Sequence, residues 1–207
     1  MTQDFIFYPG DPMIRCVLHA DWWENGKDVK LSAETAIKDP RAFYKVPFGR
    51  LERPVKRETP YEKARFEVPA MTYADIVGED GCCFALLNRS KHGYDTLNGR
   101  VRLTLLTSPS GSDVGKVPDN TADRGKHTIE YAFLPHTKEE DLEKVALSYE
   151  RGVMVFEGSD TPAVKLGETL LDASTDEKLI TSVRLLPDGT RFYRTLAKDG
   201  KLDSEIK

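Results

Sequence analysis

The residue types best suited to chemistry in this 207-residue chain are concentrated in one polar segment, residues 107–126. The segment separates two strand-like runs, Arg100–Leu106 and His127–Leu134, and is rich in Gly, Pro, Ser and Asp. Loops longer than about 12–15 residues are uncommon inside compact domains and are usually functional or disordered. This one ends in the polar cluster DNTADRG at residues 119–125. Because sugar sites need carboxylate, amide and guanidinium groups held on a rigid sheet, the segment is the first candidate for a binding site.

The last three residues of that cluster, Asp123, Arg124 and Gly125, are the sharpest candidates for contact with a ligand. Asp and Arg offer acceptors and a fork of donors to hydroxyl groups. Gly adopts unusual φ values and lets the backbone approach a ligand closely. The alternative interpretation is a surface ion pair followed by a turn glycine.

Two aromatic positions extend the list of candidates. Tyr94 and Asp95 follow the predicted strand Cys82–Asn88, and we place them on the turn after it, where Tyr would stack on a sugar and Asp would accept hydroxyl protons. The alternative is a glycine turn braced by a buried tyrosine and an Asx turn. In the pair Trp22-Trp23, strand alternation assigns Trp22 to the core and leaves Trp23 as the candidate for stacking.

The sequence assigns no catalytic residue and no metal ligand. The four histidines, at positions 19, 92, 127 and 136, lack metal-ligand spacing, and no triad pattern surrounds the last two. His19 and Asp21 have a His-x-Asp spacing, but they lie in a predicted strand and no further ligands accompany them. We therefore interpret the histidines as structural.

Period-two alternation predicts several strands. Met13–Trp22 and Val29–Ile37 alternate apolar and polar residues, and Asn25-Gly26 between them is typical of a hairpin turn, so we expect these strands to be antiparallel neighbours. Phe43–Phe48 and Ala64–Val68 are further short candidates. The charged segment between those two contains two prolines, which indicate a loop or an edge strand.

One helix is predicted near 138–150. Thr137 and Glu140 form a capping-box pattern, apolar residues follow at helical spacing, and Gly152 fits a stop signal. Beyond it, Val153–Glu157, Lys178–Leu186 and Thr190–Ala197 are strand-like, and the last two are joined by Pro187-Asp188-Gly189. Many strands with one helix predict a mostly β chain, a large antiparallel β-sandwich. We expect residues 1–150 to form the sandwich core and residues 151–207 to continue the same β-region, incomplete at its C-terminus.

Composition excludes several classes of function. Hydrophobic residues make up 39% and charged residues 31%, which suits a packed core. The net charge of −4 gives no electrostatic basis for binding nucleic acid. No apolar run reaches 18 residues, so nothing directs the chain to a membrane. The three cysteines are expected to be reduced, which indicates a cytoplasmic protein.

Several consecutive motifs carry a resemblance. LLNRSKHGYD, RVRLTLLTSP and DNTADRGKHTIEYAFLPH, in this order, resemble the C-terminal β-domain of glycoside hydrolase family 38 alpha-mannosidases of the bacterial, archaeal and vacuolar type. The similarity covers roughly residues 5–150. It implies a supersandwich of the galactose-mutarotase type, in which Asp123, Arg124 and Gly125 lie in a loop that lines the mannoside cleft of another domain. The family places an SKYGYD-like sequence around Tyr94 and Asp95.

The resemblance also implies what lies elsewhere. In this family a carboxylate nucleophile, an acid/base carboxylate and a zinc ion come chiefly from an N-terminal α/β domain, and this chain has no matching segment. The chain is therefore interpreted as a piece of an alpha-mannosidase with no cofactor of its own, either an excised domain or a truncated or split gene product. Its expected partners are the catalytic domain, in cis or as a separate chain, and mannosides, and a homo-oligomer would cover the docking face. Two alternatives stay open: a stand-alone carbohydrate-binding module and a mutarotase-like sugar epimerase.

Overall fold

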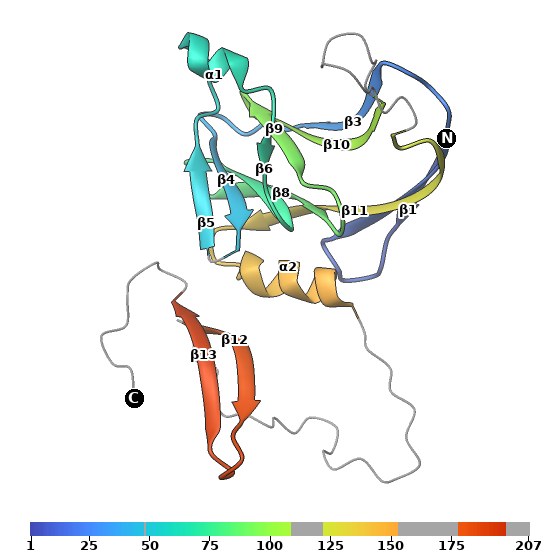
Figure 1. The fold of residues 1–207 in the computed structure, drawn as a ribbon. Coiled ribbons are helices and arrows are strands. Elements are labelled where there is room, and N and C mark those ends of the chain that lie inside the picture. The colour runs from blue at the N-terminus through green and yellow to red at the C-terminus, as the bar shows by residue number, and fades with distance from the viewer. Residues whose placement is uncertain (48, 109–121, 153–177, 198–207) are drawn as a thin grey trace. The chain divides into compact units, whose positions relative to one another are not determined.

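The computed structural model describes residues 1–47, 49–108, 122–152 and 178–197, and the side chains of the two outermost residues at each end of the last range lie outside the description (Figure 1). The chain divides into two compact units, residues 1–152 and 153–207. The described residues of unit 1 form two sheets and two helices, and the described part of unit 2 is one hairpin. Among the described residues, no helix combines the length and the apolar character that crossing a bilayer requires.

Unit 1 is an antiparallel β-sandwich, as the alternation in the sequence predicts (Figure 1). One sheet has seven strands and the other has four, and every paired strand is antiparallel to its neighbour. In spatial order the larger sheet contains β1 (Thr2–Ile6), β2 (Ile14–Trp22), β11 (Gly125–Thr137), β8 (Cys82–Asn88), β7 (Tyr73–Val77), β4 (Arg41–Val46) and β5 (Gly49–Arg53). In the same way the smaller sheet contains β3 (Lys27–Glu34), β10 (Arg100–Ser108), β9 (Gly93–Leu97) and β6 (Val68–Pro69).

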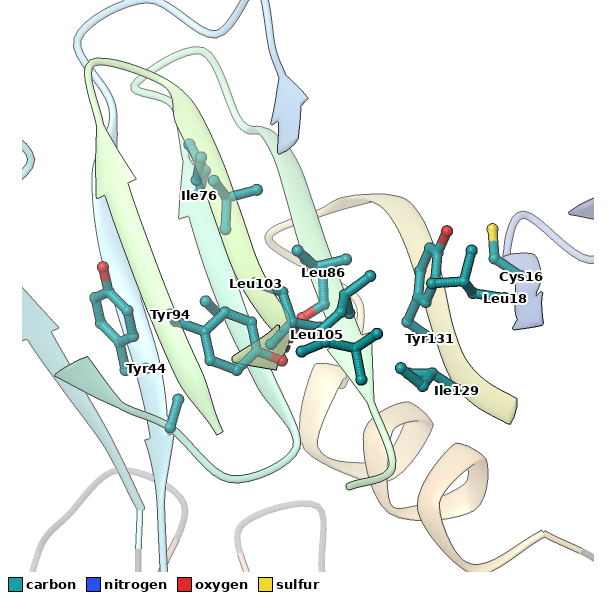
Figure 2. Close-up of a cluster of buried hydrophobic side chains, with 14 of the residues drawn as sticks. Cys16, Leu18, Tyr44, Ile76, Leu86, Tyr94, Leu103, Leu105, Ile129 and Tyr131 are labelled. Atoms are coloured by element: carbon teal, nitrogen blue, oxygen red, sulfur yellow. Dashed lines mark hydrogen bonds between the residues drawn. The ribbon is translucent and has the colours of Figure 1, made fainter. Parts of the chain in front are cut away.

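The main core lies between the two sheets. Figure 2 shows its buried side chains, with Tyr44 and Tyr94 towards one end and Cys16 and Tyr131 towards the other. Strand β2 shows how the sequence builds it, because every second residue from Cys16 to Trp22 is buried and the residues between are not. Full burial of a Leu or Ile side chain stabilises a fold by about 1.5–3 kcal/mol, so alternation on this scale fixes which face of each strand points inward.

A second cluster lies on the outer face of the larger sheet, where helix α2 (Leu142–Arg151) packs across β7, β8 and β11 (Figure 1). The helix contributes Leu142, Ala146 and Tyr149, as its spacing predicts, and it ends at Gly152, which adopts φ 62°. Strand β8 is therefore covered on both faces, as its compact apolar run indicates.

The start of α2 differs from the prediction. The N-cap residue is Asp141, whose carboxylate accepts a hydrogen bond from the backbone N–H of Lys144 at 3.2 Å. Thr137 is instead the last residue of β11. Thr137 and Glu140 fit the capping-box pattern by residue type, but Thr137 pairs with Cys82 of β8 as part of strand β11 and so does not cap the helix.

The predicted pairing of the strands on either side of Asn25-Gly26 is wrong. Gly26 does make the turn, with φ 63°. However, β2 pairs with β1 and β11, whereas β3 pairs with β10 in the other sheet. Both strands have an apolar face, and the two faces pack against each other across the core. The turn residues specify a reversal of the chain, and they do not specify which strand becomes the neighbour.

Two further local predictions need correction. The sequence predicts a strand at Ala64–Val68, but Ala64 is the last residue of a short helix, α1 (Pro60–Ala64), and of that range only Val68 is in a strand, β6 (Val68–Pro69). Thr59 caps α1 in a full capping box with Glu62, a signal that the sequence carried. Tyr94 and Asp95 lie on strand β9 and not on a turn.

In unit 2, the predicted hairpin is present. Strands β12 (Lys178–Leu185) and β13 (Arg191–Ala197) pair antiparallel, and Gly189 in the connecting turn has φ 84°. Val153–Glu157, also predicted as a strand, lies outside the described residues. Whether residues 151–207 continue the β-region of unit 1 stays a prediction.

Candidate functional site

The first candidate site lies where β2 and β10 end and β11 begins. The register pairs Trp22 with Gly125, so the residues after Trp22 meet those before Gly125 at the edge of the larger sheet. The central part of the candidate loop, residues 109–121, lies outside the described residues. We call the described residues Trp23, Asn25 and Asp123–Gly125 the Trp23–Arg124 rim.

Asp123 is held by hydrogen bonds on both sides. Its Oδ2 accepts from the backbone N–H of Thr107 at 2.8 Å, and its carbonyl oxygen lies 2.8 Å from Nε2 of His127, which donates to it. The residue adopts φ 52°, a conformation that Asp tolerates better than most residues. Together these contacts fix the direction in which the chain enters β11.

Arg124 links the start of β11 to the connection between β2 and β3, because its guanidinium donates to the side-chain oxygen of Asn25. Its Nε is screened from solvent and makes no hydrogen bond to the described residues. A buried polar atom without a partner costs about 1–3 kcal/mol, and more if charged. Such an atom marks a place where water or a ligand group would be stabilising.

The two tryptophans divide as alternation predicts. Trp22 is buried, and its indole N–H donates to the Ser108 hydroxyl at 2.7 Å, which ties the ends of β2 and β10 together. Trp23 is 67% exposed, and its indole N–H donates to Asp21 at 2.6 Å. An indole that is oriented by a hydrogen bond and has a free face can stack on an apolar face of a ligand.

Gly125 completes the rim. It has φ 121°, a value that side-chain-bearing residues rarely adopt, and no atom lies within 4 Å of the position that a Cβ would take. Glycine is therefore required here by the backbone and not by lack of space.

Tyr94 and Asp95 do not join this rim. Asp95 pairs in register with Arg102, which precedes Ser108 by six residues along β10. At about 3.3 Å per residue, this places them roughly 20 Å from the rim. Both residues are buried, with Tyr94 0% and Asp95 3% exposed. The guanidinium groups of Arg57 and Arg102 form ion pairs with the Asp95 carboxylate.

Instead, Tyr94 and Asp95 line a separate hollow of about 170 Å³. Its other walls come from residues 53–57 and from α1 with the residues that follow it. Sequence reasoning missed this hollow and interpreted the charged segment before Ala64 as a loop or an edge strand. The available signal was the five cations between Arg53 and Arg65, with Tyr61 and Phe66 among and after them.

The histidines have ordinary structural partners. His136 is the most buried, and its Nε2 lies 3.0 Å from Oδ1 of Asp75. Burial opposes its charged form, but the hydrogen bond and the negative charge of Asp75 outweigh this effect and raise the pKa of His136. His19 lies 3.6 Å from Asp4, while Asp21 accepts from Trp23, so these two residues do not act on a common ligand. In the described parts of the chain, no group of three His, Cys, Asp or Glu side chains is arranged to hold a metal ion.

An antiparallel β-sandwich is a class of domain that hosts many unrelated functions, so the fold alone does not assign one. Residues 1–119 of this chain match the family model described as the glycosyl hydrolases family 38 C-terminal domain, which is more than half of its 207 residues. The chain therefore belongs to the glycosyl hydrolase family 38 C-terminal domain family.

Individual relatives agree with this assignment. The chain is 31% identical over 200 residues to alpha-mannosidase G of Dictyostelium discoideum, which covers 93% of this chain and 18% of that protein. It is 35% identical over 136 residues to alpha-mannosidase 2C1 of Homo sapiens, which covers 66% and 12% of the two chains. The chain thus spans less than a fifth of the curated relatives that it matches.

The fold is also similar to that of a solved structure. An alpha-mannosidase from Enterococcus faecalis V583 aligns with a TM-score of 0.61 at 14% sequence identity, over 68% of this chain and 16% of that one. At this identity the likeness shows the fold alone.

Proposed function

We propose that this chain is the scaffold of an alpha-mannosidase and that its Trp23–Arg124 rim forms one wall of the mannoside cleft. The observation that carries the proposal is the rim itself: an exposed indole beside a guanidinium with an unpaired Nε and a carboxylate fixed by the backbone. Aromatic faces suit the apolar side of a hexose, and carboxylate and guanidinium groups suit its hydroxyls. The family membership of the chain supports this reading.

The bond-breaking groups, in this proposal, belong to a catalytic domain outside the present sequence. Retaining glycosidases need two carboxyl groups about 5–5.5 Å apart across the scissile bond. We expect that domain to supply both carboxylates and a zinc ion or another divalent metal, in cis with this chain. The sandwich would hold its rim against that cleft and help to exclude water from it.

Contact with such a domain needs an exposed apolar surface. The described edge strand β1 and the residues after it present Phe5, Phe7 and Tyr8, which are 53%, 67% and 54% exposed. An aromatic surface at a sheet edge suits docking better than solvent. We infer that the catalytic domain covers it, and that a homo-oligomer of the isolated chain would use the same surface.

A cytoplasmic location belongs to the same proposal. Cys16, Cys82 and Cys83 are all free thiols. Burial raises the pKa of Cys16 and Cys83 to about 11, so both stay protonated and unreactive near neutral pH. Buried free thiols are typical of reducing compartments, and we place the action on mannosides there.

An assay of the purified chain with an aryl alpha-mannoside, with and without added zinc or cobalt, tests whether the reactive groups lie outside this chain. We expect no turnover under either condition, because one wall of a cleft leaves the ligand exposed and supplies no nucleophile. Turnover by the pure chain that scales with its concentration would contradict the proposal. Light scattering on the same preparation measures whether the isolated chain forms oligomers. A strictly monomeric chain would count against an apolar surface that another subunit or domain must cover.

Ligand titrations distinguish the alternatives. A carbohydrate-binding module would bind methyl alpha-mannoside tightly without any partner, and an epimerase would interconvert sugar anomers in a coupled mutarotation assay. The scaffold proposal expects only weak, millimolar binding at the rim.

A further inference from the structure

The hollow between the two sheets has a buried side, which we call its floor, and an exposed side, which we call its roof. Its floor contains Tyr44 and Tyr94, which lie at the same end of the core cluster in Figure 2, together with Asp95. Its roof is α1 and the segment 54–57. At about 170 Å³ the hollow is smaller than the roughly 300 Å³ at which pockets for drug-sized ligands begin. Its occupant is therefore a small molecule or the end of a larger one.

Each acid that lines the hollow already has hydrogen-bond or ion-pair partners. Asp95 receives Arg57 and Arg102, with Nε of Arg102 at 2.7 Å. Glu67 pairs with Lys30. Glu62 accepts from the backbone N–H groups of Thr59 at 2.9 Å and Glu58 at 3.0 Å, which lowers the pKa of its carboxyl group. Of these acids, only Glu62 keeps its negative charge without a cationic partner among the described residues.

Three lining cations have no carboxylate partner among the described residues: Arg53, Lys56 and Arg65. Arg53 places its guanidinium carbon 5.5 Å from the ring centre of Tyr44, and its Nε is screened from solvent without a hydrogen bond. The Arg65 guanidinium lies 4.4 Å from the ring centre of Tyr61 and donates to the Tyr61 hydroxyl. An uncompensated guanidinium beside an ammonium is the arrangement that binds phosphate and carboxylate groups.

The mouth of the hollow adds aromatic surface. Tyr61 is 66% exposed and Phe66 is 70% exposed, although both line the hollow. Exposed rings beside hydrogen-bonding groups favour a ligand with one apolar face and many hydroxyls.

We propose that this hollow binds an acidic monosaccharide, a hexose that carries a phosphate or carboxylate group. Arg53, Lys56 and Arg65 hold the anion, and Tyr61 and Phe66 contact the sugar ring. The site is separate from the Trp23–Arg124 rim, since the two lie at opposite ends of β10. It therefore does not depend on whether the rim lines a mannoside cleft.

Titrations of the ¹⁵N-labelled full chain, followed by NMR and calorimetry, test the proposal. The probes are inorganic phosphate, glucose 6-phosphate, glucuronate and uncharged glucose. We expect both acidic sugars to shift resonances of residues 53–67 and to bind at least tenfold more tightly than glucose. Comparison of the two acidic sugars shows which anion the site prefers.

Matched charge variants locate the binding. Lys56→Gln removes an exposed lining cation, and Lys63→Gln removes an exposed cation of α1 that does not line the hollow. Arg53→Gln removes the half-buried cation. Because each charge-assisted hydrogen bond contributes about 1.5–3 kcal/mol, Lys56→Gln and Arg53→Gln should weaken binding about tenfold or more. Lys63→Gln should leave it within twofold.

Three results would overturn the proposal. One is the absence of any shift at residues 53–67 with either acidic sugar. Another is an equal loss of affinity in Lys56→Gln and Lys63→Gln, which would mean general attraction between charges. The third is inorganic phosphate binding as tightly as glucose 6-phosphate, which would exclude the sugar. If Arg53→Gln fails to fold, the comparison of Lys56→Gln with Lys63→Gln still tests the proposal, because the side chain of Lys56 is exposed.

Discussion

The Trp23–Arg124 rim and the cationic hollow are both polar sites on one sandwich, and they differ in how many walls they have. The rim is an edge where three strands start or end, and its indole is 67% exposed. The hollow is roofed by α1 and floored by buried residues of both sheets. A ligand gains affinity by being enclosed. We therefore propose that the rim needs a second domain for function, whereas the hollow binds its ligand without one.

The two sites also carry their charges differently. In the rim, Asp123 is satisfied mainly by backbone groups, so its charge could be removed without stranding another charge. In the hollow, Asp95 is the common partner of two guanidinium groups. The hollow is thus part of the structural core, and the rim is an addition to it.

The largest expected effect follows from this difference. Asp95→Asn leaves Arg57 and Arg102 without their buried partner, and we expect it to lower the free energy of unfolding by about 3 kcal/mol. Asp123→Asn keeps an acceptor for the N–H of Thr107, and we expect a loss below about 1 kcal/mol. Urea denaturation of the two variants gives both values. Equal losses of unfolding free energy in the two variants would contradict the proposed difference between Asp95 and Asp123.

An effect of intermediate size concerns the pH dependence of stability, and it arises at His136, which belongs to neither site. The pKa of His136 is raised in the folded chain by Asp75, which itself faces Arg50 at 3.7 Å, and more weakly by Glu140. The stabilisation from protonated His136 is therefore complete below its unfolded pKa of about 6.5 and is lost as pH rises through the folded pKa. We expect His136→Gln to destabilise the chain more at pH 5.5 than at pH 9.

The control for this experiment is His92→Gln, because His92 is exposed and contacts only a backbone carbonyl. Its cost should be small and similar at both pH values. A cost of His136→Gln that is the same at pH 5.5 and pH 9 would exclude the pairing as a source of pH dependence.

The smallest effects separate the sites by ligand. Trp23→Ala should weaken the millimolar binding of methyl alpha-mannoside a few-fold and leave acidic sugars unaffected, while Phe66→Ala should do the reverse. Both side chains are exposed, so both variants should change stability by less than about 0.5 kcal/mol. Chemical-shift titrations and thermal melts measure these quantities. A loss of both ligands in either variant would contradict the existence of two separate sites.

Sequence reasoning named most residues of the rim, although it did not predict that residues 23–25 meet residues 123–125. Asp123, Arg124 and Gly125 are consecutive, and Trp23 was singled out by alternation alone. The hollow escaped it because its lining extends along the chain from Tyr44 on β4 to Thr96 on β9, and only packing brings Arg53 and Asp95 to the same hollow. Charged residues in a segment with two prolines are ordinarily solvated, and nothing local indicates that a roof forms over them.

Local rules were enough to place several of the longer strands, the end of α2 at Gly152 and the turn at Pro187-Asp188-Gly189, where Gly189 has φ 84°. These features depend on backbone sterics and on the spacing of apolar residues over a few positions, and both can be inferred directly from the sequence. The tertiary structure alone decided that β2 and β3 enter different sheets and that Tyr94 and Asp95 lie far from the rim. Partner choice depends on which distant apolar faces bury each other best, and no short stretch of sequence contains that information.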